Sequence, residues 1–243
     1  FQREGLADTH RYDLIELPEI KCVEELITTT EGLVGFNVTI PFKQQIFPYL
    51  TELDEAACSY LKDFGAATAS NGAVGLYHID NLTPEAKKQG EALINDDAQV
   101  YVIDDAELER VYKSYPVMWK KADAKPNLCF IGCPHLTYEQ LCLWTNNIVT
   151  GLKATGKKKV AIRTIMTASP DVVAKFKKTT KYELLKRSGV KLSSICPLMY
   201  TNNPVCTGTH NMVTNSNKLR TYSKARYYKD AEILDIITGK EVK

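Results

Sequence analysis

Apolar positions in residues 12–60 follow two different spacings, which predict strands that alternate with helices. Residues 12–17 and 33–40 are short apolar runs that each end at a proline, a pattern typical of strands. Residues 20–32 and 43–60 repeat their apolar positions every three to four residues, which is the spacing of one helix face. Strand, helix, strand and helix in this order indicate the beginning of an α/β unit.

The same alternation continues through the rest of the chain. Further strand candidates are the apolar runs at residues 74–79, 128–131, 160–162 and 190–195. The repeated βα pattern predicts an α/β fold with mostly parallel βα units, arranged in two segments.

Several of the predicted helices begin with a recognisable local signal. Pro84 stands where a helix would place its first turn, and Thr137 with Gln140 forms a capping-box pattern. Residues 169–185 open with Ser-Pro-Asp and predict a further helix, which Gly189 would end.

Composition narrows the class of protein. The chain is 44% hydrophobic and 25% charged, as ordinary globular proteins are. No apolar run approaches the roughly 18 residues of a membrane span, so we exclude a transmembrane protein. No secretory signal is visible. The chain has seven cysteines, an odd number that disulfide bonds could not pair completely, and a chain of this length does not need disulfides for stability. We therefore expect reduced thiols or metal ligands in a cytoplasmic protein.

Charge divides the chain at one point. Residues 1–57 hold 4 Lys and Arg against 11 Asp and Glu, whereas residues 58–243 hold 27 against 18. We therefore expect these two segments to be separate domains. The densest basic stretch, residues 153–191, spreads its charges between apolar positions at helical spacing and has no aromatic platform. It predicts a solvated helix face, so we expect neither nucleic acid nor a membrane as partner.

Residues 35–43 contain the most specific motif of the acidic segment. Asn37 and Thr39 occupy alternate positions of a predicted strand and so point the same way. Lys43 follows at a place where it could bind a carboxylate or act as an acid or base. Around this motif, residues 1–57 resemble part of the substrate-binding domain of shikimate dehydrogenase. The resemblance implies that Thr39 binds the substrate and that Lys43 is catalytic, and Asn37 is a further candidate for substrate binding.

This resemblance implies an NADP-dependent oxidoreductase as one alternative function. A nicotinamide dinucleotide needs a phosphate-binding turn such as G-x-G-x-x-G, and the chain has no such turn. The serine pair, the later asparagine and the catalytic aspartate of that family are also missing. We therefore expect that the chain does not bind NADP.

Three blocks of the basic segment carry further specific motifs. They are residues 61–67 with 70–78 and 83–86, then Gly132-Cys133-Pro134-His135-Leu136-Thr137, and finally Ile195-Cys196 with Thr214-Asn215-Ser216-Asn217-Lys218 and Tyr222. In this order they resemble the C-terminal half of the large subunit of aconitase X, over about residues 61–243. Members of that family are hydro-lyases that dehydrate small hydroxy acids.

Cys133 and Cys196 connect this resemblance to a chemistry. Cys133 follows a predicted strand and precedes a predicted helix, where backbone N–H groups and the helix dipole favour a thiolate. Cys196 also follows a strand candidate, so both thiols would meet at the strand ends. The resemblance implies that these two cysteines, with a third from an N-terminal half missing here, bind an iron–sulfur cluster or iron.

Alternatives remain open for each of these candidates. Cys133 could instead be a buried structural residue. Cys129, Cys133 and His135 could also suggest a zinc site, but the sequence has no second pair of ligands to complete it. His78 is a candidate catalytic base, although a structural histidine is the more common role.

Polar residues after the last apolar run form a second candidate site. Thr214, Asn215, Ser216 and Lys218 supply donors for a carboxylate or a phosphate, and an ordinary helix N-terminus is the alternative.

The sequence therefore predicts an aconitase X-like hydro-lyase that dehydrates a small hydroxy carboxylate at an iron–sulfur or iron centre and is incomplete in this chain. Its expected partners are the hydroxy-acid substrate, a small swivel-type subunit and the missing N-terminal half. The alternatives are the shikimate dehydrogenase-like oxidoreductase and a non-catalytic chimeric fragment or binding module.

Overall fold

The computed structural model describes residues 15, 18–19, 21–29, 55–201 and 210–240. Its contacts divide the chain into a first unit, Phe1–Leu53 with Gly75–Asn95, and a second unit, Asp54–Val74 with Asp96–Lys243. The domain boundary predicted at residues 57–58 stays a prediction, because most of the residues before it lie outside the described part.

Short helices are the regular elements described in the first unit. They are α1 (Cys22–Thr29), α3 (Pro84–Gln89) and the 3-10 turn η3 (Gly90–Leu93). α1 lies within the helix predicted at residues 20–32, and α3 has Pro84 in its first turn, as predicted. The strands predicted at residues 12–17 and 33–40 fall almost entirely outside the described residues.

The strand predicted at residues 74–79 is wrong. This stretch is described without helix or strand, and both Val74 and Leu76 are exposed. An apolar run becomes a strand only when a neighbouring strand pairs with its backbone groups. No such partner is present among the described residues.

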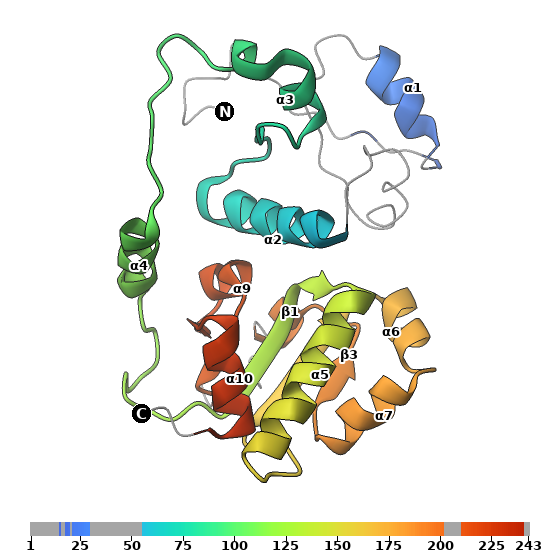
Figure 1. Cartoon of the computed structure of the whole chain (residues 1–243), viewed down its shortest axis with the longest axis vertical. Coiled ribbons are helices and arrows are strands. Elements are labelled where there is room, and N and C mark those ends of the chain that lie inside the picture. The colour runs from blue at the N-terminus through green and yellow to red at the C-terminus, as the bar shows by residue number, and fades with distance from the viewer. Residues whose placement is uncertain (1–14, 16–17, 20, 30–54, 202–209, 241–243) are drawn as a thin grey trace. The chain divides into compact units, whose positions relative to one another are not determined.

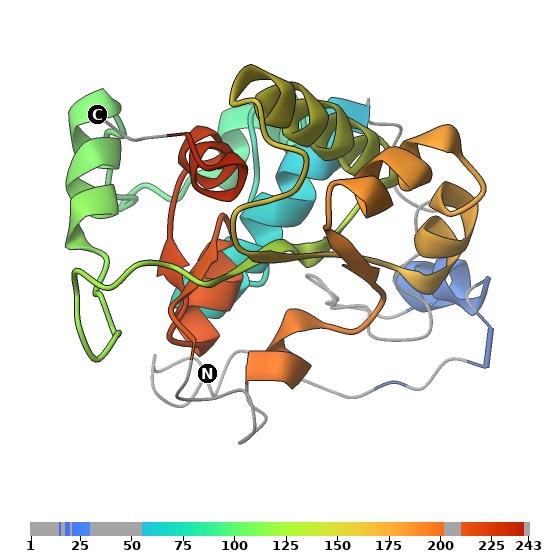
Figure 2. The ribbon, with the colours of Figure 1, turned by 90° about the horizontal axis from the view of Figure 1, so that it is seen from below.

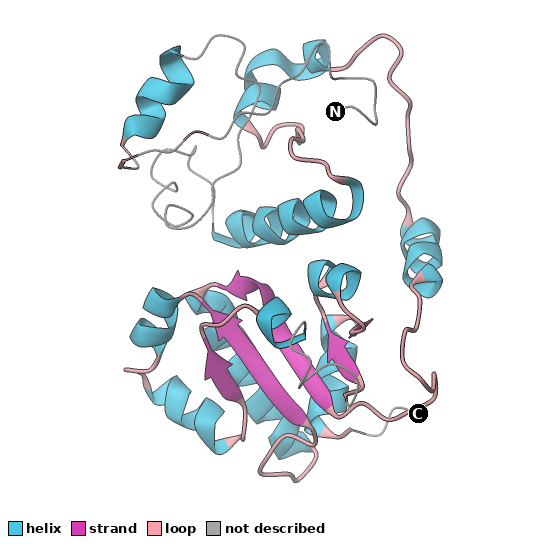
Figure 3. Ribbon diagram, turned by 180° about the vertical axis from the view of Figure 1, so that it is seen from behind, coloured by secondary structure: helices cyan, strands magenta, loops and turns pink. Residues whose placement is uncertain are grey.

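A sheet of five parallel strands forms the centre of the second unit (Figures 1 and 3). The strands are β1 (Leu128–Leu136), β2 (Arg163–Ala168), β3 (Lys191–Ser193), β4 (Met212–Thr214) and β5 (Arg226–Tyr227). They lie in the order β3-β2-β1-β4-β5, and every neighbouring pair is parallel. The predicted α/β fold with parallel pairing is confirmed.

Side chains of the central strand alternate between the two faces of the sheet, because successive residues of a strand point to opposite sides. Cys129 and Ile131 belong to one buried apolar cluster, and Leu128 and Phe130 belong to the other. Burial on both faces is typical of strands in a parallel sheet and explains the unbroken apolar run at residues 128–131.

Different helices cover these two faces, as the view along the sheet in Figure 2 indicates. The larger cluster takes its apolar side chains from α5 (Tyr138–Ala154), α6 (Pro170–Phe176), α7 (Thr180–Arg187) and α10 (Asp230–Thr238). The smaller cluster is covered by α8 (Pro197–Thr201) and α9 (Asn217–Tyr222).

Two further helices of the second unit pack against this α/β core. α2 (Glu55–Gly72) contacts α9 and β1. α4 (Asp105–Ser114) is joined to α10 by a hydrogen bond from Tyr112 to Glu232. No described helix combines the length and the apolar character that crossing a membrane requires.

Several predicted boundaries differ from the structure. The strand placed at residues 160–162 begins at Arg163 instead, because the N–H groups of Val160 and Ala161 bind carbonyls of Ser188 and Ile237 rather than a neighbouring strand.

Two predicted helices also have other limits. The helix predicted at residues 169–185 is two helices, since Thr179 caps the start of α7 and interrupts the first one. The described part of the helix predicted at residues 43–60 begins at Glu55 and continues to Gly72.

Candidate functional site

The candidate site lies where the connections of the sheet change direction. From β1 the chain moves to β2 and β3 on one side, and it later returns to β4 and β5 on the other. The helices after β1 and β4 therefore diverge at the carboxyl ends of these neighbouring strands. Open α/β sheets bind their ligands at this kind of switch point.

Gly132 shapes the end of β1 through a close contact with Thr167 on β2. Its φ is +109°, and a Cβ atom there would lie 2.3 Å from the carbonyl oxygen of Thr167. The Oγ1 of Thr167 also donates to the carbonyl of Gly132 at 2.5 Å. Residues 132–135 bulge out of the regular β1–β2 pairing, which places Cys133 within the bulge.

Cys133 is buried at this bulge and faces the smaller apolar cluster. Burial raises the pKa of the Cys133 thiol above its ordinary value. A hydrogen bond with Ser216 and the charge of Lys218 lower this pKa, whereas Cys196 and Asp63 raise it further. Burial thus acts against the thiolate that is expected at this position. Ser216, Lys218, Cys196 and Asp63 each act on the Cys133 thiol. We call these four residues and Cys133 the thiol site.

Cys196 enters the thiol site from the loop between β3 and α8. Its residue is exposed, unlike Cys133, and its carbonyl accepts a hydrogen bond from the N–H of Met199 at 2.9 Å. Cys196 acts electrostatically on the Cys133 thiol. A shared ligand site of these two cysteines stays a prediction. They come from strands that are not neighbours, and β2 separates β1 from β3.

The predicted polar residues after β4 form the beginning of α9. The Oγ of Ser216 accepts from the N–H of Leu219 at 2.9 Å and donates to the carbonyl of Cys133. Thr214 accepts from the N–H of Ser216 at 3.1 Å, and Asn215 donates to Asp230 at 2.8 Å. The ordinary helix N-terminus is therefore present, and it fastens the thiol site to β1.

Lys62 and Asp63 on α2 are site residues that the sequence analysis missed. The Nζ of Lys62 donates to the carbonyl of His135 and to Oε1 of Gln140, both at 2.7 Å. Burial lowers the pKa of Lys62, while the neighbouring carboxylate of Asp63 raises it. An adjacent lysine and aspartate ahead of the small residues 65–70 were the available signal.

Asp63 brings a carboxyl group to the thiol site. Partial burial of its carboxyl group raises the pKa of Asp63, although the residue as a whole is exposed. The charge of Asp230 also raises this pKa, whereas Lys62 and a hydrogen bond with Gln140 lower it. A carboxyl group with a raised pKa keeps its proton to a higher pH than an ordinary carboxyl group, which makes Asp63 a candidate for proton transfer.

The described residues do not fit a complete iron–sulfur cluster. Such clusters are held by several thiolates, and here Cys133 and Cys196 are two. No group of three or more His, Cys, Asp and Glu suited to a metal ion occurs in the described ranges.

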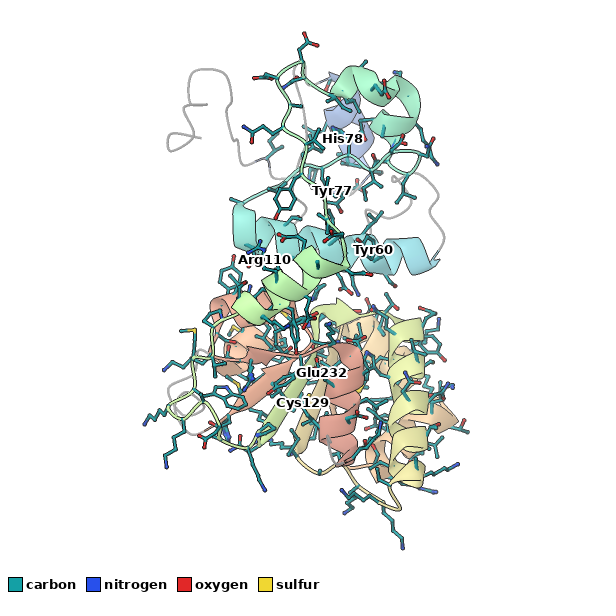
Figure 4. All side chains as sticks on the ribbon, turned by 60° about the vertical axis from the view of Figure 1, so that its left-hand side comes forward. Tyr60, Tyr77, His78, Arg110, Cys129 and Glu232 are labelled. Carbon is teal, nitrogen blue, oxygen red and sulfur yellow. The ribbon has the colours of Figure 1, made fainter. Side chains whose placement is uncertain are left out.

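The zinc alternative fails for a geometric reason. Cys129 and Cys133 belong to the two apolar clusters on opposite faces of β1. Burial raises the pKa of Cys129 strongly, and this thiol is part of the core. Figure 4 shows Cys129 within the sheet.

The remaining predicted residues lie elsewhere. His78 belongs to the first unit, where its Nδ1 is 3.9 Å from Oε2 of Glu85. Asn37, Thr39 and Lys43 lie outside the described residues.

A shallow hollow is found at the other end of the sheet. It is lined by Leu128, Phe130, Arg163, Ile165, Tyr200, His210 and Met212. Leu128, Arg163 and Met212 begin their strands, so this hollow lies away from the thiol site at the carboxyl ends.

Comparison with known proteins finds two domains of one family. Residues 19–113 match the family model of the aconitase X second domain, and residues 126–237 match that of the aconitase X third domain. The phosphomevalonate dehydratase large subunit of Thermococcus kodakarensis is 27% identical over 194 residues, which are 80% of this chain and 46% of that protein. That of Methanothermobacter thermautotrophicus is 30% identical over 123 residues, 51% of this chain and 28% of that protein.

A solved structure has a similar fold. The crystal structure of the holo-form of aconitase X from Thermococcus kodakaraensis gives a TM-score of 0.58 at 24% identity, and covers 77% of this chain and 45% of that one. A shorter likeness joins the chain to the NADP(+) shikimate dehydrogenase of Staphylococcus aureus, 42% identical over 57 residues, which are 24% of this chain and 21% of that protein. The chain thus spans less than half the length of each of these relatives.

Proposed function

Because residues 19–113 and 126–237 belong to the aconitase X family, we propose that the chain contributes part of a hydro-lyase site that dehydrates a small hydroxy carboxylate. The thiol site is the observation that supports this proposal. It gathers two thiols, a lysine and a carboxyl group at the switch point of a parallel sheet. The large-subunit dehydratases among the relatives point to the same reaction class.

Dehydration breaks a C–H bond and a C–O bond on neighbouring carbons, forms a C=C bond and releases water. The C–H proton needs a base, and a negatively charged substrate needs donors that hold it. We assign the proton transfer to Asp63, whose raised pKa suits the task, and the binding of the carboxylate to Lys218. His78 remains a second candidate for the base, and Thr214, Asn215 and Ser216 remain candidates for substrate binding.

The cofactor that we propose for the complete enzyme is an iron–sulfur cluster or iron, for which Cys133 and Cys196 would supply two ligands. The described residues do not form a complete ligand set, so no step of the reaction is assigned to the metal. We expect weak iron binding by this chain alone. Anaerobic reconstitution with iron and sulfide, followed by visible absorbance, measures it. Unchanged iron uptake in Cys133→Ser and Cys196→Ser would contradict the ligand assignment.

The proposed partners follow from the names of the relatives, which are large subunits. We propose a small, swivel-type subunit and the portion of the large subunit that this chain lacks. A cytoplasmic location is part of the same proposal, because free thiols such as those of Cys133 and Cys196 persist in a reducing compartment.

An assay of dehydration tests the function. Phosphomevalonate, named for the relatives, and other small hydroxy carboxylates are incubated with the chain alone and with the missing large-subunit portion and small subunit of a relative. We expect the unsaturated product, followed by ultraviolet absorbance, in the completed mixture. Cys133→Ser should abolish it, whereas Cys142→Ser on α5 serves as a matched thiol control. Activity that survives in Cys133→Ser would overturn the proposal.

The shikimate dehydrogenase-like segment supports a second candidate function. The likeness over 57 residues motivates it, with Asn37 and Thr39 as substrate contacts and Lys43 as the catalytic residue. The function would require NADP, for which the chain has no phosphate-binding turn. Titration with NADPH distinguishes the two candidates, and micromolar binding would favour the oxidoreductase.

A further inference from the structure

We propose that Lys62 is a positioning residue of the thiol site, which fastens the end of β1 and the start of α5 so that Cys133 is held in its buried position. The proposal rests on the proposed function for its purpose, since that function assigns a role to Cys133. The inference itself depends on contacts between segments far apart in the sequence.

The ammonium of Lys62 binds two acceptors on either side of a turn. One is the carbonyl of His135, two residues after Cys133, and the other is Oε1 of Gln140 in the first turn of α5. Both distances are 2.7 Å, as expected for strong hydrogen bonds from a charged donor. One side chain therefore connects the bulge of β1 to the helix that follows it.

Gln140 makes this connection more effective because its oxygen is shared. The same Oε1 accepts from the N–H of Thr137 at 3.0 Å, and Thr137 in turn accepts from the N–H of Gln140 at 3.1 Å. Lys62 thus binds a capping box that already fixes the beginning of α5. Lys62 therefore holds the segment between Cys133 and α5 at His135 and, through Gln140, at the start of the helix.

Other contacts hold α2 itself in place, so that Lys62 can act as a fixed point. At the far end of the helix, Oδ1 of Asn71 accepts from Nη2 of Arg220 at 2.9 Å and from Oγ1 of Thr221 at 2.8 Å. Both donors belong to α9, whose cap residue Ser216 binds the carbonyl of Cys133. α2 therefore joins the two elements that flank Cys133.

The loss of Lys62 has a local consequence. The carbonyl of Cys133 would keep its bond to Ser216, but the carbonyl of His135 and the oxygen of Gln140 would lose their charged donor. Loosening of the bulge exposes the thiol of Cys133. Cys129 on the same strand is buried in the opposite apolar cluster and is not affected by a change confined to the bulge.

Alkylation of the two thiols in the full chain tests the proposal. Wild type, Lys62→Met and Lys62→Arg are treated with iodoacetamide, and tandem mass spectrometry separates modification of Cys133 from that of Cys129. We expect Cys133 to react roughly five- to tenfold faster in Lys62→Met, because a hydrogen bond from a charged donor is lost, and Cys129 to be unchanged. Lys62→Arg should restore the slow rate, since a guanidinium can serve both acceptors.

A matched lysine provides the control. Lys181 on α7 donates to Oδ1 of Asn146 on α5 at 2.7 Å but is exposed and does not contact the bulge. Lys181→Met should leave both thiols as slow as in wild type. If Lys62→Met does not fold, as judged by circular dichroism, Lys62→Gln is used, and an intermediate acceleration of Cys133 is expected.

Two results would overturn the proposal. An unchanged rate at Cys133 in the folded Lys62 variant would mean that Lys62 does not hold the bulge. Equal acceleration of Cys129 and Cys133 would mean that Lys62 stabilises the whole sheet and has no particular effect on the thiol site. Neither readout involves a substrate or a metal, so a failure of the dehydration assay leaves this test intact.

Discussion

Gly132 occupies a position where any side chain would meet the backbone of the next strand. Gly132→Ala adds a Cβ that would lie 2.3 Å from the carbonyl oxygen of Thr167, at a φ of +109° that alanine rarely adopts. We expect the free energy of unfolding to fall by roughly 2–4 kcal/mol, because strain and a backbone shift combine. Urea denaturation followed by circular dichroism measures it.

A substitution at Gly156 distinguishes the cost of a positive φ from the cost of the close contact with Thr167. Its φ is +68°, but a Cβ there would meet nothing within 4 Å. Gly156→Ala should therefore cost only the conformational part, about 1 kcal/mol. Equal losses at Gly132 and Gly156 would show that the close approach to Thr167 contributes nothing.

The buried thiol of Cys129 should make the folded chain less stable in alkaline solution. Burial raises the pKa of its thiol in the folded chain, whereas the unfolded thiol ionises near pH 8.5. Above that pH the unfolded state gives up a proton that the folded state keeps, so the free energy of unfolding falls by up to about 1.4 kcal/mol per pH unit. Cys129→Ala should reduce this slope, as urea denaturation at several pH values would measure. Parallel slopes would contradict the prediction.

Local signals at single residues were readable from the sequence, whereas contacts between distant residues were not. Thr137 and Gln140 were predicted to cap a helix, and they do, because both partners lie within one turn. Lys62 and His135 are 73 positions apart, and no spacing rule connects them. A shared site of Cys133 and Cys196 at the strand ends stays a prediction. The burial of Cys133 agrees with the buried role that the sequence left open for it.

At the scale of elements, α4 is attached to α10 through Tyr112, and an ion pair of Glu109 with Lys229 at 3.3 Å adds a second link. The hydroxyl of Tyr112 donates to the carboxylate of Glu232 on α10 at 2.8 Å, and its ring contacts that of Tyr227 edge-on at 6.0 Å. Tyr112→Phe keeps the ring contact but removes the hydrogen bond. We expect a loss of about 1–2 kcal/mol and faster amide hydrogen exchange in α4 than in wild type.

Tyr222 is a suitable control for this substitution. It lies on α9 with half of its surface exposed, and its hydroxyl has no hydrogen bond to another described residue. Tyr222→Phe should leave the free energy of unfolding within about 0.5 kcal/mol of wild type. If exchange in α4 does not change in Tyr112→Phe, the bond to Glu232 is not what holds this helix.

The elements that could be predicted are those with long or fully apolar patterns. β1 has an unbroken apolar run, and α5 repeats its apolar residues over several turns. β4 and β5 were missed because they are three and two residues long and gain strand structure by pairing with β1 and with each other. Pairing of this kind is set by the tertiary fold, not by local pattern.

At the scale of the whole molecule, residues 98–103 are an exposed connection. They form neither helix nor strand, and Val100 and Tyr101 are 91% and 68% exposed. We expect chymotrypsin to cut first after Tyr101, because proteases need an exposed, extended chain.

Mass spectrometry of a time course would identify that first cut. Tyr101→Ser should delay it without changing later products. A domain boundary at the change of charge would instead favour a first cut near residues 58–63. These residues belong to α2, and a first cut there would mean that the helix is not formed in solution.

The order of the strands has a consequence for synthesis of the chain. β1 pairs with β4 through Leu128 and Met212, so the strand that covers this edge of β1 is made long after β1 itself. At about 5–20 residues per second, residues 129–212 take the ribosome roughly 4–17 s to add. During that interval β1 and β2 can pair, while the other edge of β1 presents free backbone groups. A nascent chain of this kind exposes a strand edge that chaperones or a second nascent chain can bind until Thr214 has emerged.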